Sequence, residues 1–428
     1  SPAYFFEAMD TVFFVMKIIN SLLSSLVIFP AYLLAKEFLN KKKSCMIAAL
    51  TALIPTIFTM NFYVFSENLF FPLFLFSVYF LYKTFSKYKW YWALLTGLFI
   101  GLSLLTRFSA IALLATLILI TLWKLFKRET KAFFAVFLSL FTFFLIITPW
   151  LYAKVQLFGW SLQSILLGYS PELQTATQQN FIFVKMIWIF LYTNYLFLAL
   201  GILVAIFAFQ VIGDYKHANK KEKTVIEIIL CLSIITIALA ANNSGNIIPY
   251  TAHRVIGRYI AAIFPLWLLL SFLANPKIKR SYTLITALFL MISTPFILFG
   301  IFFPINNSEL IWIEISKIGI NNISLSTIFI TGLVTLFTLS LLFLKKIKTN
   351  TYFTFLAIVF IGISLLSTTA IIYDAQERWE PLEEVQLGHW ITENLPSDAS
   401  FYFNPEDIEY FEQGTPIDRT NAEDRPIT

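Results

Sequence analysis

The chain has 428 residues, of which 58% are hydrophobic and only 13% are charged, and its formal net charge is +6. Its mean hydropathy is +0.75. In a soluble globular domain about a quarter of the residues are charged, so this composition excludes that class and indicates an integral membrane protein.

Apolar segments about 20 residues long recur along almost the whole chain. In a bilayer such segments must be helices, because the lipid core offers no partner to an unpaired backbone polar group. The sequence therefore predicts an all-α, polytopic transmembrane bundle of about twelve helices. In chain order the predicted spans are 11–35, 44–63, 68–84, 90–106, 108–123, 131–153, 184–212, 224–241, 258–274, 281–303, 323–344 and 351–373. Only Arg107 separates the short segments 90–106 and 108–123, so a single re-entrant hairpin is the alternative there.

Lysine and arginine concentrate in every second loop, and short cytoplasmic loops retain such cations during insertion. The basic loops lie at 36–43, 83–89, 124–131, 216–223, 277–280 and 345–348. We therefore expect these loops to face the cytoplasm, and both chain ends to lie outside, in a multi-pass protein of the cell membrane. The net positive charge follows from this pattern, so it indicates no nucleic-acid partner.

The predicted topology divides the chain into a membrane domain, 1–373, and an acidic extracytoplasmic tail, 374–428. The tail is expected to begin a small soluble α/β domain, with a helix at 390–395, a strand at 399–403 and a helix or turn at 405–413. An N-terminus outside the cell requires an upstream insertion signal, and none is visible before the first span. One more helix, and part of the outer loop that follows it, are therefore expected to precede Ser1.

Ionisable side chains are costly at membrane depth, so those that occur there usually face a cavity or a partner. The cytoplasmic half is expected to hold no set of them apart from its loop cations. On the predicted topology the outer half holds Lys17, Glu67, Arg107, Lys185, Arg254 and Arg258. We therefore expect the functional site at the outer, extracytoplasmic face.

Glu67 stands in the sequence Ser66-Glu67-Asn68, directly before a predicted span. Its carboxylate could bind a divalent metal ion, orient an acceptor or bind a sugar hydroxyl. The alternative interpretation is a helix start, in which Ser66 caps the helix and Glu67 in the first turn interacts favourably with the helix dipole.

The outer arginines indicate an anionic partner. Arg107 has no basic neighbour at its helix junction; the alternative is a side chain that extends to the membrane surface. Arg254 and Arg258 are four residues apart, so in a helix they share a face. Two guanidiniums with a helix N-terminus behind them suit a phosphate or pyrophosphate. The alternative is a pair of interfacial anchors that form ion pairs with Glu309 or Glu314.

Two further polar residues, Lys17 and Asn20, lie about one helical turn apart in the first predicted span. Asn20 is expected to form a hydrogen bond between helices. The chain has three histidines, and only His253 lies near the predicted arginine cluster, so a three-histidine metal site is excluded by count.

Several short stretches together resemble the GT-C superfamily of membrane glycosyltransferases. The similarity is closest to the branch that uses polyprenyl-phosphate sugars, which includes the protein O-mannosyltransferases of family 39 and the aminoarabinose transferases. The stretches cover much of the chain and lie at 1–4, 17–25, 30–36, 66–73, 97–107 and 257–265.

This resemblance implies a GT-C fold and an inverting transfer of mannose, or a similar hexose or pentose, from a polyprenyl- or dolichyl-phosphate donor. The acceptor would be a protein, a lipid or a polysaccharide on the extracytoplasmic face. In this family the general base is usually an aspartate of the first outer loop, which is expected upstream of Ser1. Glu67 is then a candidate for the acceptor side or for a divalent metal ion. The candidate substrate-binding residues are Lys17, Asn20, Arg107, His253, Arg254, Arg258 and Tyr259.

Two other classes remain open from the sequence. A secondary transporter or lipid flippase of the cell envelope would place its charges near the bilayer midplane, at broken helices within inverted repeats. A non-catalytic scaffold of envelope assembly could share the fold without the activity.

Overall fold

The computed structural model describes residues 9–159, 182–245, 255–275, 277–298, 306–313, 323–344 and 346–374. The chain falls into two compact units, Ser1–Thr369 and Ala370–Thr428, and the helices described below belong to the first, except for the last residues of α18. The described residues form helices and turns, with one isolated bridge between Lys277 and Lys346 as their only β-type pairing. The all-α bundle is thus confirmed, whereas the predicted α/β elements at 390–413 lie outside the described residues.

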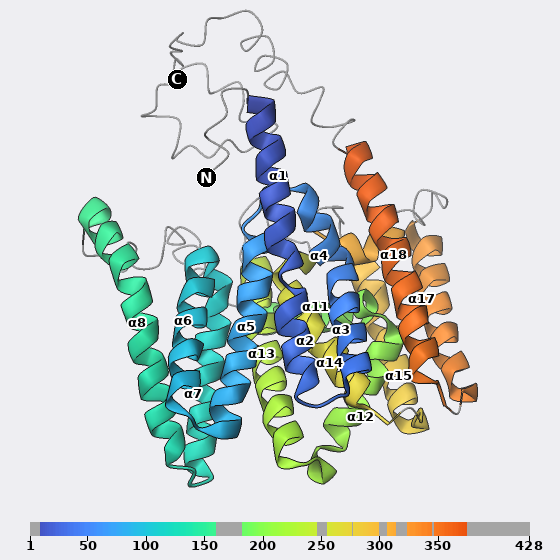
Figure 1. The fold of residues 1–428 in the computed structure, drawn as a ribbon. Coiled ribbons are helices and arrows are strands. Elements are labelled where there is room, and N and C mark those ends of the chain that lie inside the picture. The colour runs from blue at the N-terminus through green and yellow to red at the C-terminus, as the bar shows by residue number, and fades with distance from the viewer. Residues whose placement is uncertain are drawn as a thin grey trace, which may run out of the picture. The chain divides into compact units, whose positions relative to one another are not determined.

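Each predicted span contains at least one helix of the structure (Figure 1). The α-helices are α1 (Met9–Ser25), α2 (Ile28–Lys36), α3 (Lys41–Leu53), α4 (Pro55–Thr59), α5 (Glu67–Lys87), α6 (Trp90–Thr106), α7 (Ile111–Phe126), α8 (Lys131–Phe158), α11 (Ile182–Leu200), α12 (Ile202–Gly213), α13 (Lys220–Gly245), α14 (Phe264–Leu273), α15 (Arg280–Leu298), α17 (Ile323–Ser340) and α18 (Thr349–Asp374). Short 3-10 turns include η2 (Met60–Phe62), η3 (Phe108–Ala110), η5 (Gly257–Tyr259), η6 (Ala261–Ile263) and η7 (Ser308–Leu310).

The number of membrane crossings stays a prediction. Among the described residues, eight helices are long and apolar enough to cross a membrane, or up to ten if each of two bent pairs is one span. Two shorter apolar helices, Trp90–Thr106 and Ala261–Leu273, match further predicted spans. The chain is in any case a multi-pass membrane protein.

Several spans that were predicted as continuous helices are broken. The span 44–63 bends by 58° after Leu53. Pro55 follows the break and disfavours a helical conformation for the residue before it. The span 184–212 bends by 113° at Gly201, whose φ of 89° is a conformation that glycine adopts readily. The span 258–274 becomes α-helical only from Phe264, after two 3-10 turns.

Small residues let α6 and α8 approach closely. A side-chain carbon at Gly97 would overlap the backbone oxygen of Ser139. The hydroxyl of Ser139 in turn donates to the backbone oxygen of Ala93 at 2.9 Å. Glycine four residues from a second small residue, here Gly101, is a common arrangement at helix contacts in membranes.

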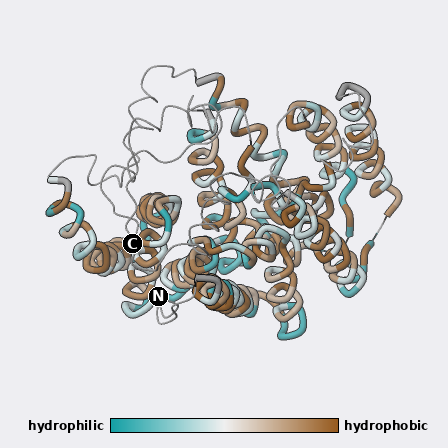
Figure 2. Tube along the Cα trace, turned by 90° about the horizontal axis from the view of Figure 1, so that it is seen from above, coloured by the Kyte–Doolittle hydropathy of each residue, from teal (hydrophilic) through white to brown (hydrophobic). Residues whose placement is uncertain are grey.

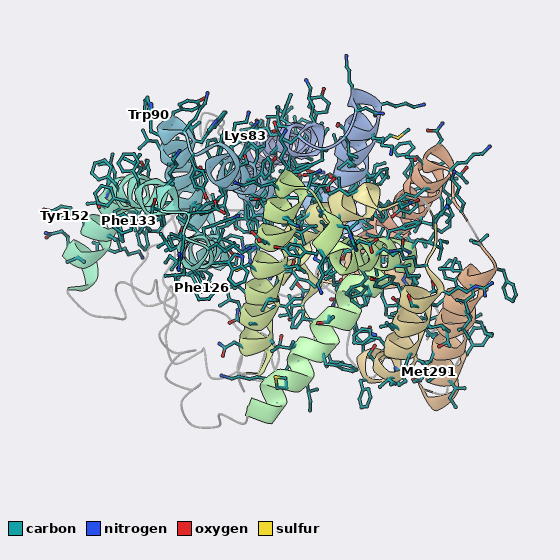
Figure 3. All side chains as sticks on the ribbon, turned by 90° about the horizontal axis from the view of Figure 1, so that it is seen from below. Lys83, Trp90, Phe126, Phe133, Tyr152 and Met291 are labelled. Atoms are coloured by element: carbon teal, nitrogen blue, oxygen red, sulfur yellow. The ribbon has the colours of Figure 1, made fainter. Side chains whose placement is uncertain are left out.

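The lateral surface of the bundle is apolar, as expected where a protein faces lipid. Most of the helical trace is hydrophobic (Figure 2). Figure 3 shows Phe133 and Tyr152 of α8 and Met291 of α15 pointing away from the bundle, and these side chains are 64%, 65% and 46% exposed. The most buried helix is α14, in which every residue from Phe264 to Phe272 is buried.

The basic turns lie together at one end of the helices, the lower end in Figure 1. Contacts link them in pairs. The hydroxyl of Tyr88, after α5, donates to Glu129 before α8 at 2.7 Å. Asp214, after α12, pairs with Lys279, before α15, at 2.6 Å. The bridge from Lys277 to Lys346 joins the turn before α15 to the turn before α18. The alternation of basic loops in the sequence therefore identified turns that share one end, here called the inner end.

Buried ion pairs at this inner end were not predicted. Lys83 of α5 is 4% exposed and pairs with Glu37. Lys124 of α7 is also 4% exposed and lies 3.3 Å from Glu227 of α13. The expectation that these two lysines are solvated loop cations was therefore wrong. Lys83 lies within the predicted span 68–84, and α7 extends past its predicted end to include Lys124. Both lysines are therefore on helices within the bundle and require carboxylate partners.

Candidate functional site

Glu67, Arg107 and Arg258 come together at the other end of the bundle, here called the outer end. Glu67 begins α5, Arg107 follows the last residue of α6, and Arg258 is the middle residue of η5. The carboxylate of Glu67 forms an ion pair with Arg107. The same oxygen, Oε1, lies 3.8 Å from Nη1 of Arg258. Three parts of the chain that are distant in sequence thus form one charged cluster, which we call the outer triad.

The outer triad has one buried anion and two partly open cations. Glu67 is 2% exposed, whereas the side chains of Arg107 and Arg258 are 20% and 25% exposed. The three groups carry one negative and two positive formal charges. Two partly desolvated cations attract an anion more strongly than the same charges would in water.

The helix-start interpretation of this region is only partly correct. Glu67 does lie in the first turn of α5, but the side chain of Ser66 forms no capping hydrogen bond. Its hydroxyl instead points to Oε2 of Glu67, at 3.4 Å. The alternative in which Ser66 caps the helix was therefore wrong. Ser66 has helical backbone angles, whereas a capping residue usually has extended ones that direct its hydroxyl to the backbone donors.

Aromatic rings from the same outer segment pack against both arginines. The guanidinium of Arg107 lies 6.0 Å from the ring centre of Phe70, and that of Arg258 lies 5.5 Å from the ring centre of Phe65. Such contacts stabilise a cation over the face of a ring.

Asn68 holds the loop before α5 in place. Its buried amide donates to the backbone oxygens of Met60 and Tyr63, both at 3.0 Å. The ring of Tyr63 stacks on that of Phe65 with centroids 5.2 Å apart. The loop that carries the aromatic side of the site is therefore anchored by the residue next to Glu67.

One donor of Arg258 has no partner among the described residues. Its Nε is buried and makes no hydrogen bond with them. A buried donor of a charged group that stays unpaired costs free energy, about 1–3 kcal/mol or more, so such groups usually meet a ligand, a water molecule or a further residue. Together with the two guanidinium charges, this donor makes the outer triad a suitable site for an anionic oxygen.

A second buried segment holds the turn that carries Arg258. The backbone N–H of Gly257 donates to Oδ1 of Asn307 at 3.0 Å. The backbone N–H of Arg258 donates to the backbone oxygen of Asn306 at 3.1 Å. We call residues 306–309 the anchor segment, because these bonds fix the orientation of η5.

The anchor segment is itself fixed by Glu309. This residue is fully buried; its Oε1 accepts from the backbone N–H of Thr56 at 3.0 Å, and its Oε2 accepts from the hydroxyl of Tyr195 at 2.9 Å. Burial raises the pKa of the Glu309 carboxyl above its ordinary value of 4.5, and the two hydrogen bonds oppose that shift. Glu309 therefore ties the anchor segment to α4 and α11 at the outer end.

The predicted pairing of the interfacial arginines with Glu309 or Glu314 was wrong for Arg258. Its carboxylate partner is Glu67, whereas the oxygens of Glu309 are taken by Thr56 and Tyr195. Glu314 lies outside the described residues.

The predicted helical fork of Arg254 and Arg258 was also wrong. Residues 255–256 are not helical and 257–259 form a 3-10 turn, so no α-helical face carries both positions. The physical reason is that the backbone N–H groups of the turn bind Asn306 and Asn307 rather than a preceding helical turn. Arg254 and His253 lie outside the described residues.

The structure also places four other polar residues that the sequence singled out: Lys17, Asn20, Tyr259 and Lys185. Lys17 is exposed on α1 and takes part in no ion pair with the described residues. Asn20 donates to the backbone oxygen of Met16 at 3.0 Å, so its hydrogen bond lies within one helix. The predicted hydrogen bond between helices was wrong. Tyr259 follows Arg258 in η5 and is half-buried. Lys185 is half-buried near the start of α11.

Gly257 is required by a close approach. A side-chain carbon there would overlap the hydroxyl end of Tyr195, which is fully buried and bonded to Glu309. We expect Gly257→Ala to lower the free energy of unfolding by about 1–3 kcal/mol, because the core cannot accommodate the added carbon. The matched control is Gly332→Ala in α17, where nothing lies within 4 Å of the added carbon. Denaturation in detergent compares the two, and an equal effect on both would contradict the steric explanation.

The outer triad does not fit a divalent metal ion. Two guanidiniums share its one carboxylate, and their positive charges oppose a cation at the same place. No group of three His, Cys, Asp or Glu side chains able to hold a metal comes together in the described parts of the chain.

Comparison with known proteins gives one match. Residues 3–152 match the sequence model of the dolichyl-phosphate-mannose-protein mannosyltransferase family. That stretch contains Glu67 and Arg107 of the outer triad and ends before Arg258. No curated protein and no solved structure matches the chain.

Proposed function

We propose that this chain is a membrane glycosyltransferase of the GT-C type that transfers a sugar from a polyprenyl- or dolichyl-phosphate donor. Its match over residues 3–152 supports this proposal. The sugar would be mannose or a similar hexose or pentose. The acceptor would be a hydroxyl group of a protein, a lipid or a polysaccharide at the extracytoplasmic face of the cell membrane.

The outer triad suits the donor's phosphate. In the proposed reaction the acceptor oxygen forms a bond to the anomeric carbon while the bond from that carbon to the phosphate oxygen breaks. Polyprenyl phosphate leaves with an additional negative charge, and the acceptor gives up its proton to a base outside the triad. Fixed positive charge beside the leaving oxygen lowers the barrier to this step. A single displacement would invert the configuration at the anomeric carbon.

The observation that carries the proposal is the buried Nε of Arg258, which has no partner among the described residues, within a cluster of two guanidiniums and one carboxylate. Arg107 and Arg258 would donate to the phosphate oxygens. Glu67 would act as a positioning residue, because it is buried and its carboxylate contacts both guanidiniums. This role replaces the metal or acceptor role that the sequence alone left open for Glu67.

Replacement of Glu67 tests the positioning role. We expect Glu67→Gln to lower kcat for transfer by about 10- to 100-fold, because the neutral amide no longer holds the two guanidiniums in place. Glu67→Asp should recover part of the loss. The matched control, Glu222→Gln at a half-buried position of the inner end, should keep full activity. Full activity of Glu67→Gln in a folded protein would exclude the positioning role.

A transfer assay tests the function itself. The purified chain in proteoliposomes would be given a polyprenyl-phosphate sugar with a labelled sugar, together with an acceptor carrying hydroxyl groups. We expect a new glycosidic bond whose anomeric configuration is the inverse of that in the donor.

The rival function is a transporter or flippase, and the two bent helix pairs are the feature that favours it. Against it, the 113° bend at Gly201 lies between Leu200 and Ile202, which are apolar, and the outer triad lies at helix ends. Movement of labelled lipid across the liposome membrane without any glycosidic product would favour the rival and contradict the proposal.

A further inference from the structure

A groove at the inner end lies between the start of α6 and the start of α8, far along both helices from the outer triad. Its lining combines two lysines, three aromatic residues and small alanines: Lys89 and Lys131; Tyr88, Trp90 and Phe134; and Ala93 with Ala135. The small residues leave room between the two helices, and the lysines come from two different turns.

The two turns that form this groove have fixed backbones. Tyr88 and Arg128 have φ values of 50° and 63°, and they are the two non-glycine residues with positive φ in the described chain. The hydroxyl of Tyr88 donates to Glu129 at 2.7 Å, which ties the first turn to the second. This hydrogen bond therefore holds the two turns beside each other.

The lysines of the groove are available to bind an anion. Neither Lys89 nor Lys131 forms an ion pair with a carboxylate of the described residues. Glu129, the one acidic residue of these turns, already accepts from Tyr88 and pairs with Lys124 at 3.8 Å. The groove thus has two exposed positive charges that the surrounding carboxylates do not neutralise.

An apolar stripe continues from the groove along α8. Phe134, Phe137, Phe141 and Leu145 recur every three or four residues, so they share one face of the helix. They are 60%, 57%, 59% and 61% exposed, in that order. Trp90 beside the groove is 63% exposed and, like Phe133, points outward in Figure 3. A ligand with an anionic head and an apolar tail could bind the two lysines with its head and cover the apolar stripe of α8 with its tail.

We propose that this groove binds an anionic phospholipid of the inner leaflet. The lipid's phosphate lies between the ammonium groups of Lys89 and Lys131, and an acyl chain follows the exposed face of α8. Basic pockets between transmembrane helices at the cytoplasmic side suit such head groups, and tryptophan and tyrosine are favoured at the head-group level. This site is separate from the outer triad, so it does not depend on the proposed transfer reaction.

The test is lipid binding to the purified full chain in detergent, read as the rise of the thermal midpoint on titration with phosphatidylglycerol. Removal of both charges in Lys89→Gln/Lys131→Gln should weaken the apparent affinity by about tenfold. The charge-preserving variant Lys89→Arg/Lys131→Arg should keep it. The matched control is Lys41→Gln/Lys42→Gln, which removes two exposed lysines of another inner turn and should bind as the wild type does.

Two comparisons identify the ligand. Phosphatidylcholine and inorganic phosphate should each give a much smaller shift than phosphatidylglycerol. Equal shifts for the two lipids, or a shift with inorganic phosphate alone that matches phosphatidylglycerol, would overturn the lipid site. An unchanged affinity in Lys89→Gln/Lys131→Gln would overturn it as well.

Discussion

Replacement of Arg258 by alanine is expected to lower sugar transfer by about 100- to 1000-fold, the usual effect of removing one donor that stabilises developing charge. Arg258 supplies the buried Nε and one of the two guanidiniums that face the single carboxylate of Glu67. Its side chain is partly open, so the loss should fall on the reaction rather than on insertion or folding. Transfer of labelled sugar, measured at equal amounts of folded protein, gives the effect.

Two comparisons make this result specific. Arg280→Ala removes an exposed arginine at the inner end and should leave transfer unchanged. Arg258→Lys keeps the charge but loses the planar set of donors, so it should restore activity only in part. Turnover of Arg258→Ala equal to that of the wild type would remove the phosphate role from the outer triad.

Replacement of Glu309 by alanine is expected to have the largest effect on stability, about 3 kcal/mol or more. The change leaves the backbone N–H of Thr56 and the hydroxyl of Tyr195 without their acceptor in the core, and each buried unpaired donor costs about 1–3 kcal/mol. Chemical denaturation in detergent measures the loss. The control Lys221→Ala, at an exposed position, should change stability little.

Glu309 also predicts a pH dependence with a defined sign. Because burial raises the pKa of its carboxyl above 4.5, the folded protein holds this proton more tightly than the unfolded chain does. Its contribution to stability is therefore complete below about pH 4.5 and is lost as the pH rises through the folded-state pKa.

Glu309→Gln keeps the shape and removes this titration. The difference in thermal midpoint between the wild type and Glu309→Gln should move in favour of the glutamine variant as the pH rises above 4.5. A constant difference across that range would show that Glu309 has the same pKa in the folded and unfolded states.

Sequence reasoning located the helices well because lipid imposes one strong rule, an apolar segment long enough to span the core. It did not locate the breaks. Gly201 and Pro55 were visible in the sequence, but glycine and proline are also tolerated within continuous transmembrane helices. Only the packing around residues 54 and 201 decides that the chain bends there.

The charged site was predicted in part. Glu67, Arg107 and Arg258 stood out as rare ionisable residues at helix ends, and the structure brings them together. Tyr195 and Asn307 carried no such signal, because a tyrosine within a span and an asparagine in a loop are common. Glu309 was considered only as a counter-ion, since nothing in the sequence places it beside Thr56 or Tyr195.

The central claim, that Arg107 and Arg258 hold the phosphate of a prenyl donor, is tested most directly by equilibrium binding of polyprenyl phosphate to the purified chain. The corresponding prenyl alcohol, which lacks the phosphate, is the reference ligand. The account predicts that the phosphate binds more tightly than the alcohol and that Arg107→Gln/Arg258→Gln removes this difference. Equal binding of the two ligands to the wild type, or a preference that survives in the double variant, would contradict it.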